Sequence, residues 1–376
     1  MTGKLLRAFA AVAVLAAAAL IGWRVLAPAE VLEPATGAYP VAATVPPGVT
    51  GKLAMAPLIV AGSVRVYAGA RLVKADGPVE AKTIHTARWS FRRWPERLTG
   101  IVAVGTTVVT RWSDGELVAL DGRTGKVTWR AAGPRAASFT GRTGSAAVWA
   151  PPGLHTAGTA VLVSDGRQLI AHAAADGARR WAVPLPAGCA NGFVTTGDRY
   201  VCDTGVRDLR TGGPADGWPA GPFTPVGCDV ARSGCAGLRD GSGHGWLTGG
   251  TRPERTPALD APDATAAEDL VLTSAGGAVA ASRAGREVWR RAGAAQVLGA
   301  RAGRVALLTP DRRLVMLDLA GGTERAAFPL YVAKERAEPW TTEQWQLTDG
   351  HLAVERLMPT ASGEFYSLEP VVVAVF

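Results

Sequence analysis

The feature that most constrains the fold is a short pattern that returns about every 40 residues along the chain. The clearest copy runs from Glu116 to Trp129 and reads Glu-Leu-Val-Ala-Leu-Asp-Gly-Arg-Thr-Gly-Lys-Val-Thr-Trp. Residues 116–120 are typical of a strand, Asp121 to Gly125 of a tight turn, and the residues up to Trp129 of a second strand. The Asp-Gly and Thr-Gly pairs supply the positions with positive φ that such a hairpin needs.

Degenerate copies follow in register, and their spacing predicts the architecture. They occupy 168–181, 278–289 and 313–328, the last with Phe328 in the Trp position, and weaker copies end at Trp89, Trp218 and Trp246. A period near 40 residues is that of one four-stranded propeller blade. We therefore predict an all-β chain folded as a single propeller of eight blades. The short step from Trp218 to Trp246 leaves seven blades as an alternative. The apolar run from Val371 should close the ring against a strand near 57–67, which removes the open edges.

The pattern Leu-x-Ala-Leu-Asp-x-x-Thr-Gly-x-x-x-Trp resembles the repeat of the pyrroloquinoline-quinone-type, or quinoprotein-like, propellers. The resemblance is specific at 116–129, moderate in three further copies, and extends over about 57–376. The family holds both quinoprotein dehydrogenases and cofactor-free scaffolds. The chain looks like the non-enzymatic, membrane-anchored branch, similar to the propeller lipoprotein of the outer-membrane barrel assembly machinery. The resemblance implies that each Trp docks on a neighbouring blade and has a structural role.

No catalytic, cofactor-binding or metal-binding residue is predicted, and we expect no enzyme activity. The dehydrogenases of the family stack their quinone against a disulfide of adjacent cysteines, and this sequence contains no adjacent Cys pair. Asp114, Asp121 and Asp318 lie at expected turns, where Asp bonds to nearby backbone N–H groups. Residues 241–245 are interpreted as a hairpin turn. The five histidines have no metal-ligand spacing and are interpreted as surface or packing residues: His85, His155, His172, His244 and His351.

The N-terminal residues are typical of a membrane anchor. Lys4 and Arg7 precede an uncharged run from Ala8 to Trp23, which with its flanks is just long enough to span a bilayer. We predict a transmembrane helix within 1–26, a Pro/Ala-rich linker over 27–56 and the propeller over 57–376. A signal peptide cleaved near residue 29 is the alternative. With basic residues before the span, the predicted localisation is the cell membrane, single-pass, with the C-terminal domain extracytoplasmic.

Two further groups of residues depart from the repeat. Four cysteines, Cys189, Cys202, Cys228 and Cys235, fall in one short region, and an even count in an exported protein predicts two disulfides. Pairing between sequence neighbours is the simplest of the three connectivities. Trp340 and Trp345 follow the charged residues 334–338 and are a possible partner-binding surface. The alternative is that both rings pack at a blade edge.

The formal net charge of +8 lacks the clustered basic runs of nucleic-acid-binding proteins, so no nucleic acid is expected. The predicted function is a monomeric, membrane-tethered extracytoplasmic scaffold that binds proteins or cell-envelope components. Two alternatives remain open. One is a quinone- or metal-dependent oxidoreductase with its site in the propeller channel, and the other is a ligand-binding sensor that acts through a membrane partner.

Overall fold

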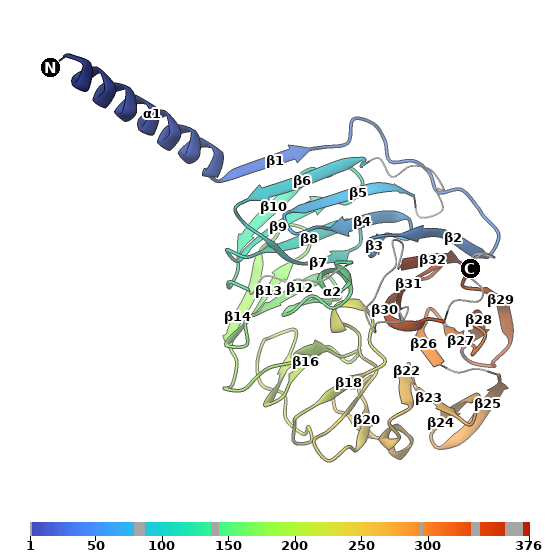
Figure 1. The fold of residues 1–376 in the computed structure, drawn as a ribbon. Coiled ribbons are helices and arrows are strands. Elements are labelled where there is room, and N and C mark those ends of the chain that lie inside the picture. Colours follow the sequence, from blue (N-terminus) through green and yellow to red (C-terminus); the bar gives the residue numbers. More distant parts are fainter. Residues whose placement is uncertain (1, 79–86, 137–142, 294–295, 332–338, 358–370) are drawn as a thin grey trace.

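The computed structural model describes residues 2–78, 87–136, 143–293, 296–331, 339–357 and 371–376. Its strands form eight separate antiparallel sheets, which follow one another around a ring (Figure 1). The prediction of an eight-bladed all-β propeller is confirmed, and the seven-bladed alternative is not. We number the blades 1 to 8 along the chain, each from the strand nearest the ring axis outward.

Blades 1 to 4 form the first half of the ring, and blade 4 has three strands where the others have four or five. Blade 1 contains β3 (Pro57–Val60), β4 (Val64–Ala68), β5 (Leu72–Pro78), β6 (Trp89–Trp94) and, outermost, β1 (Ala29–Glu33); blade 2 contains β7 (Leu98–Val104), β8 (Thr107–Trp112), β9 (Glu116–Asp121) and β10 (Val127–Ala132); blade 3 contains β11 (Leu154–Ala157), β12 (Ala160–Ser164), β13 (Gln168–Ala173) and β14 (Arg179–Pro184); blade 4 contains β15 (Phe193–Val194), β16 (Arg199–Cys202) and β17 (Gly205–Asp208).

Blades 5 to 8 complete the ring, and three short helical segments, α2, η1 and η2, connect strands within it. Blade 5 contains β18 (Thr224–Val226), β19 (Gly237–Arg239), β20 (Gly245–Leu247) and β21 (Glu254–Arg255); blade 6 contains β22 (Ala264–Ala267), β23 (Leu270–Ala275), β24 (Ala278–Arg283) and β25 (Arg286–Ala292); blade 7 contains β26 (Gln296–Arg301), β27 (Arg304–Leu308), β28 (Arg313–Asp318) and β29 (Glu324–Pro329); blade 8 contains β30 (Thr341–Leu347), β31 (His351–Leu357), β32 (Val371–Val375) and β2 (Gly48–Leu53); the helical segments are α2 (Ser145–Trp149), η1 (Val230–Arg232) and η2 (Pro257–Asp260).

The ring is closed by strands from the two ends of the chain. The C-terminal strand β32 pairs with β31 on one side and with β2 on the other, so β2 is the outer strand of the last blade. Closure by the apolar run from Val371 was expected, but its predicted partner near 57–67 is wrong. That stretch holds the two innermost strands of blade 1, whose β3 has only β4 as a neighbour in the sheet.

Part of the predicted linker over 27–56 is built into the sheets. Strand β2 lies in blade 8, and β1 adds to β6 as a fifth strand on the outer edge of blade 1. Glu30 on β1 forms ion pairs with Arg93 and Arg130, and Glu33 accepts a 2.7 Å hydrogen bond from Ser90. The N-terminal residues are thereby fixed to the propeller from Ala29 onward.

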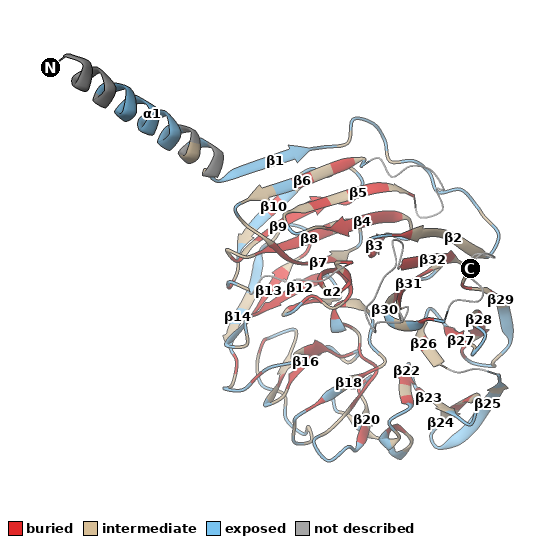
Figure 2. Ribbon diagram, viewed as in Figure 1, coloured by how far each residue is buried: buried red, intermediate tan, exposed pale blue. Residues whose placement is uncertain are grey.

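Helix α1 (Thr2–Leu26) projects away from the ring (Figures 1 and 2). Its described side chains run without a gap from Phe9 to Leu20, and all of them are exposed. Among the described residues, no helix is both long and apolar enough to cross a membrane. The prediction of a single-pass membrane localisation through this helix is corrected on that finding.

The hydrophobic core is a series of clusters between neighbouring blades rather than a single centre. A strand in the middle of a blade is covered on both faces by the adjoining blades, so β8 and β9 are buried over almost their whole lengths. The outer strand β10 alternates, and Trp129 is its one buried residue. Figure 2 shows the same change from buried to exposed between inner and outer strands.

Four tryptophans connect successive blades, as the resemblance implied. The indole N–H groups of Trp89, Trp129, Trp181 and Trp289 each donate to a backbone carbonyl of the next blade, at 2.8–3.0 Å. Each ring lies against a glycine of that blade. A Cβ on Gly177, for example, would lie 2.5 Å from the Trp129 ring, and its φ of 74° is itself strained for other residues. The Asp–Gly turn of one repeat therefore receives the Trp of the preceding one.

Candidate functional site

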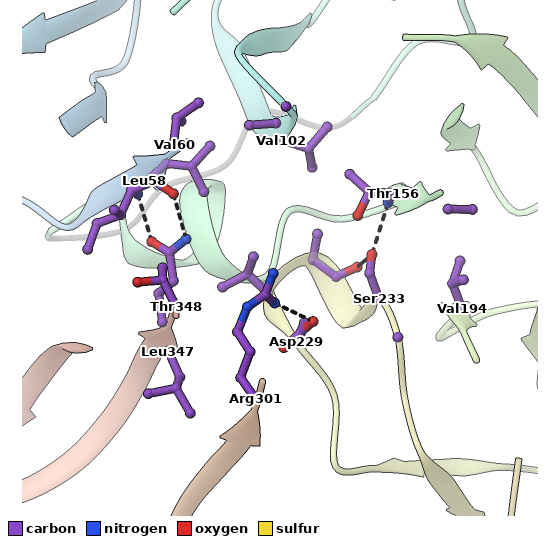
Figure 3. A pocket seen from close by; sticks show the side chains of 18 of the residues that line it. Leu58, Val60, Val102, Thr156, Val194, Asp229, Ser233, Arg301, Leu347 and Thr348 are labelled. Carbon is purple, nitrogen blue, oxygen red and sulfur yellow. Dashed lines mark hydrogen bonds and ion pairs between the residues drawn. The ribbon is translucent and has the colours of Figure 1, made fainter. Parts of the chain in front are cut away.

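The ring encloses a central cavity of about 680 Å³, which is lined by residues of six blades and of η1. The lining comes from the innermost strands and from the turns that connect each of them to the second strand of its blade. Gly62, Gly105, Gly158 and Asp198 lie in four of these turns. Because strands alternate in direction, these turns all lie on the same face of the ring. Figure 3 shows side chains from several blades converging on this space.

The loop between Cys228 and Cys235 lies inside the channel and contacts blades on opposite sides of it. Its Ala231 carbonyl accepts a 2.7 Å hydrogen bond from Nδ1 of His155 in blade 3. The hydroxyl of Ser233 accepts a 2.9 Å hydrogen bond from the backbone N–H of Thr156 (Figure 3). Asp229 forms an ion pair with Arg301 of blade 7, at 2.7 Å. The disulfide therefore closes a short loop that is hydrogen-bonded to the innermost strand of blade 3 and ion-paired with the innermost strand of blade 7.

Helix α2 also lies at the axis, beside η1. The indole N–H of Trp149 donates to the Pro57 carbonyl of blade 1 at 2.9 Å, and Val148 contributes to the cavity lining. Just before the helix, the Thr143 hydroxyl donates to the Glu355 carboxylate of blade 8. The centre of the propeller is thus partly filled by two segments of the chain itself.

Among the residues that the structure describes, the charged side chains that line the cavity are three carboxylates and one guanidinium: Asp198, Asp229, Asp349 and Arg301. Arg301 donates to Asp229 at 2.7 Å and to Asp349 at 2.8 Å. Burial disfavours the charged form of Arg301, but the two carboxylates outweigh it and raise the pKa of the guanidinium. Burial likewise raises the pKa of Asp229, and Arg301 opposes that shift. The cavity mouth therefore carries a net negative charge, although the whole chain is positive.

The structure pairs Cys189 with Cys202 and Cys228 with Cys235, the local connectivity considered in the sequence. The first bridge fixes the connection into blade 4, where both sulfurs lie in the cluster between blades 3 and 4. The second closes the loop in the channel. Sequence spacing indicated the pairs but gave no sign that the second loop would enter the ring.

Trp340 and Trp345 are packed at blade 8 rather than displayed on the surface. Trp340 is only 6% exposed and lies in the cluster between blades 7 and 8. Trp345 is half-buried, and its indole N–H donates to the Leu298 carbonyl. This position favours the packing alternative for both rings. The charged residues 334–338 before them lie outside the described residues.

The predicted turn residues behave as expected. Asp121 accepts hydrogen bonds from the backbone N–H groups of Arg123 and Thr124, and Asp114 and Asp318 bind nearby N–H groups in the same way. The turn of the weaker copy that ends at Trp218 was not identified from the sequence. Asp208 to Gly212 repeats the Asp-x-x-Thr-Gly turn of Asp121 to Gly125 and receives Trp181. The identical Arg-Thr-Gly in the two turns was the available signal.

The histidines take different positions. His155 and His172 are buried, His244 is exposed beside Asp240 in the turn between β19 and β20, and His85 lies outside the described residues. His351 lies at the start of β31. Within the described part of the chain, no three His, Cys, Asp or Glu side chains are grouped closely enough to hold a metal ion.

No family model matches the sequence, and no curated protein matches it. Solved structures that resemble the fold include BamB from Moraxella catarrhalis, with 16% identity over 89% of this chain and 99% of that one and a TM-score of 0.45. Sqt1 from Saccharomyces cerevisiae has 9% identity over 87% and 96% of the two chains and a TM-score of 0.47. A quinohemoprotein alcohol dehydrogenase from Comamonas testosteroni has 13% identity over 87% and 74% and a TM-score of 0.39. Similarities of this size do not separate one function from another.

Proposed function

We propose that this chain is a non-catalytic propeller scaffold that binds other proteins through the face carrying the mouth of the central cavity. The observation that carries the proposal is the convergence of six blades on that mouth. Turns held by rigid sheets present backbone and side-chain groups in fixed positions, which is how many folds display binding residues. Because this surface is already ordered before a partner binds, the propeller would lose little conformational freedom on binding.

The charge of this face indicates the chemistry of the partner. Asp198 is exposed and Asp349 is 76% exposed, whereas Arg301, the single cation among the described lining residues, is already paired with two carboxylates. A basic segment of a partner protein would complement the carboxylates and gain in association rate. The two disulfides support a scaffold that works in an oxidising compartment, because such bonds persist there.

Site-specific cross-linking in cells tests the proposal. A photoreactive residue at Thr196, which is exposed and lines the cavity, should capture a partner protein. The same group at Arg286, exposed on the outer strand β25, should not capture that protein. The double variant Asp198→Asn/Asp349→Asn should weaken the capture, since it removes two of the carboxylates that line the mouth.

Two results would contradict the scaffold. One is equal capture from Thr196 and Arg286, because the cavity face would then have no special role. The other is purified protein that carries a stoichiometric quinone with its characteristic absorbance, because the oxidoreductase alternative would then explain the channel better.

A further inference from the structure

A second cavity, of about 520 Å³, lies between blades 2, 3 and 4. It is lined by the turn between β12 and β13 and by the connections that enter blades 3 and 4. These segments lie at the strand ends opposite to the turns around the central cavity. The second cavity therefore opens on the other face of the ring, and Ser164, Asp165 and Tyr200 are part of its lining.

Arg111 places a buried positive charge at this cavity. Its side chain is 1% exposed, and its guanidinium donates to the carbonyls of Pro152, Gly153 and Pro134 at 3.0–3.1 Å. Among the described residues its hydrogen bonds go to backbone carbonyls and not to a carboxylate, and Nε has no hydrogen-bond partner. Burial lowers the pKa of Arg111 to about 10, and Asp165 opposes the shift from a distance. The group is thus charged at neutral pH, buried, and held rigidly by backbone.

His155 adds a buried acceptor to the same cavity. Its Nδ1 faces the Ala231 carbonyl and must donate the proton there, which leaves Nε2 as an acceptor. Nε2 is buried and has no partner among the described residues. Burial lowers the pKa of His155 to about 4, so the ring is neutral at physiological pH. A buried acceptor without a donor is unfavourable, and a hydroxyl group brought by a ligand would satisfy it.

The remaining charges of the cavity have the same sign as Arg111. Arg135 and Arg232 are exposed lining residues, and Asp165 is the one carboxylate among the described lining residues. Three guanidinium groups against one carboxylate leave an excess of two positive charges. We propose that this cavity binds a small molecule that carries an oxyanion, a phosphate or carboxylate group, together with a hydroxyl donor. Arg111, Arg135 and Arg232 hold the oxyanion, and Nε2 of His155 accepts from the hydroxyl.

Calorimetric titration of the full chain with inorganic phosphate and, separately, with malonate tests this site. At least one anion should bind saturably with one site per chain, and the tighter of the two identifies the oxyanion class. Arg135→Ala combined with Arg232→Asn removes two exposed charges without touching buried Arg111, and Asn tolerates the left-handed φ of 47° at position 232. The affinity should fall at least about tenfold, the equivalent of one lost charge-assisted hydrogen bond.

The matched control is Arg123→Ala combined with Arg179→Ala, which removes two exposed arginines elsewhere on the ring. This variant should bind the anion as the original chain does. Equal weakening in both double variants would show that only the overall charge matters, and the site would be rejected. The absence of saturable binding of either anion to the original chain would also overturn the proposal.

Discussion

At the scale of single residues, the same interaction is repeated from blade to blade. A Trp on the fourth strand of a blade donates its indole N–H to a backbone carbonyl of the next blade. Its ring also covers a glycine of that blade, at which any side chain would crowd the ring. Trp129 is 7% exposed, and it packs both against Gly177 and, stacked, against the ring of His172. Because each blade is covered only by its neighbours, such a contact stabilises two blades at once.

Trp129→Ala should lower the free energy of unfolding by about 3–5 kcal/mol, the usual cost of removing a large buried aromatic ring. Trp129→Phe keeps most of the buried surface and loses the hydrogen bond to Ala174, so its cost should be nearer about 1 kcal/mol plus a small packing term. Denaturant unfolding followed by circular dichroism measures both. An alanine variant as stable as the original chain would show that this ring is not part of the core.

His155 should make the stability dependent on pH. Its pKa is about 4 in the folded chain and about 6.5 in an unfolded one. Between these values the unfolded chain binds a proton that the folded chain does not, so stability is complete above about pH 6.5 and falls as the pH drops toward 4. The slope is at most about 1.4 kcal/mol per pH unit. In His155→Gln this contribution disappears, and parallel slopes for the two proteins between pH 6.5 and 4 would contradict it.

At the scale of elements, the loop between Cys228 and Cys235, here called the channel loop, is held in its conformation by its disulfide. Ala231 and Arg232 both have positive φ, as do Gly227 just before the loop and Gly234 within it. Non-glycine residues rarely adopt this conformation unless their surroundings hold them in it. The bridge between Cys228 and Cys235 and the contacts with His155 and Thr156 supply that restraint.

Replacing Cys228 and Cys235 by Ser should lower the free energy of unfolding by about 2–3 kcal/mol, because the unfolded chain loses a closed loop. It should also release the loop from blade 3, which is measured by hydrogen exchange at the amide of Thr156. That amide donates to Ser233 and should lose protection. Replacing Cys189 and Cys202 should cost a similar free energy but leave Thr156 protected. Equal protection in both double variants would show that the loop keeps its place without the bridge.

The elements also show how far sequence reasoning could reach. The repeat at 116–129 predicted its strands and turn because hairpin geometry, turn residues and Trp docking all act locally. The path of the 228–235 loop and the cavity of Arg111 depend on contacts between blades far apart in sequence. Nothing in the local pattern around Arg111 distinguishes a buried arginine from an exposed one. The role of β2 was also missed, because its partner β32 is distant in sequence. Residues 48–53 themselves contain two glycines and a lysine and show no alternation of apolar and polar residues.

At the scale of the whole molecule, closure decides whether the other interactions can exist. A propeller with an open ring exposes the inner faces of its first and last blades, and the exposed strand edges invite association with other chains. Here β2 and β32 pair over residues 48–53 and 371–375, so the ends of the chain hold each other in the last blade. The arrangement of both candidate sites requires that ring, because each cavity is lined by several blades.

Two truncated chains test this closure most directly. A chain that begins at Gly37 lacks α1 and β1 but keeps β2, and a chain that begins at Ala54 lacks β2 as well. We predict that the first unfolds in one cooperative thermal transition close to that of the full chain. The second should lose that transition and aggregate or become sensitive to protease throughout the ring. If the two chains unfold alike near the temperature of the full chain, the closed eight-bladed ring is contradicted.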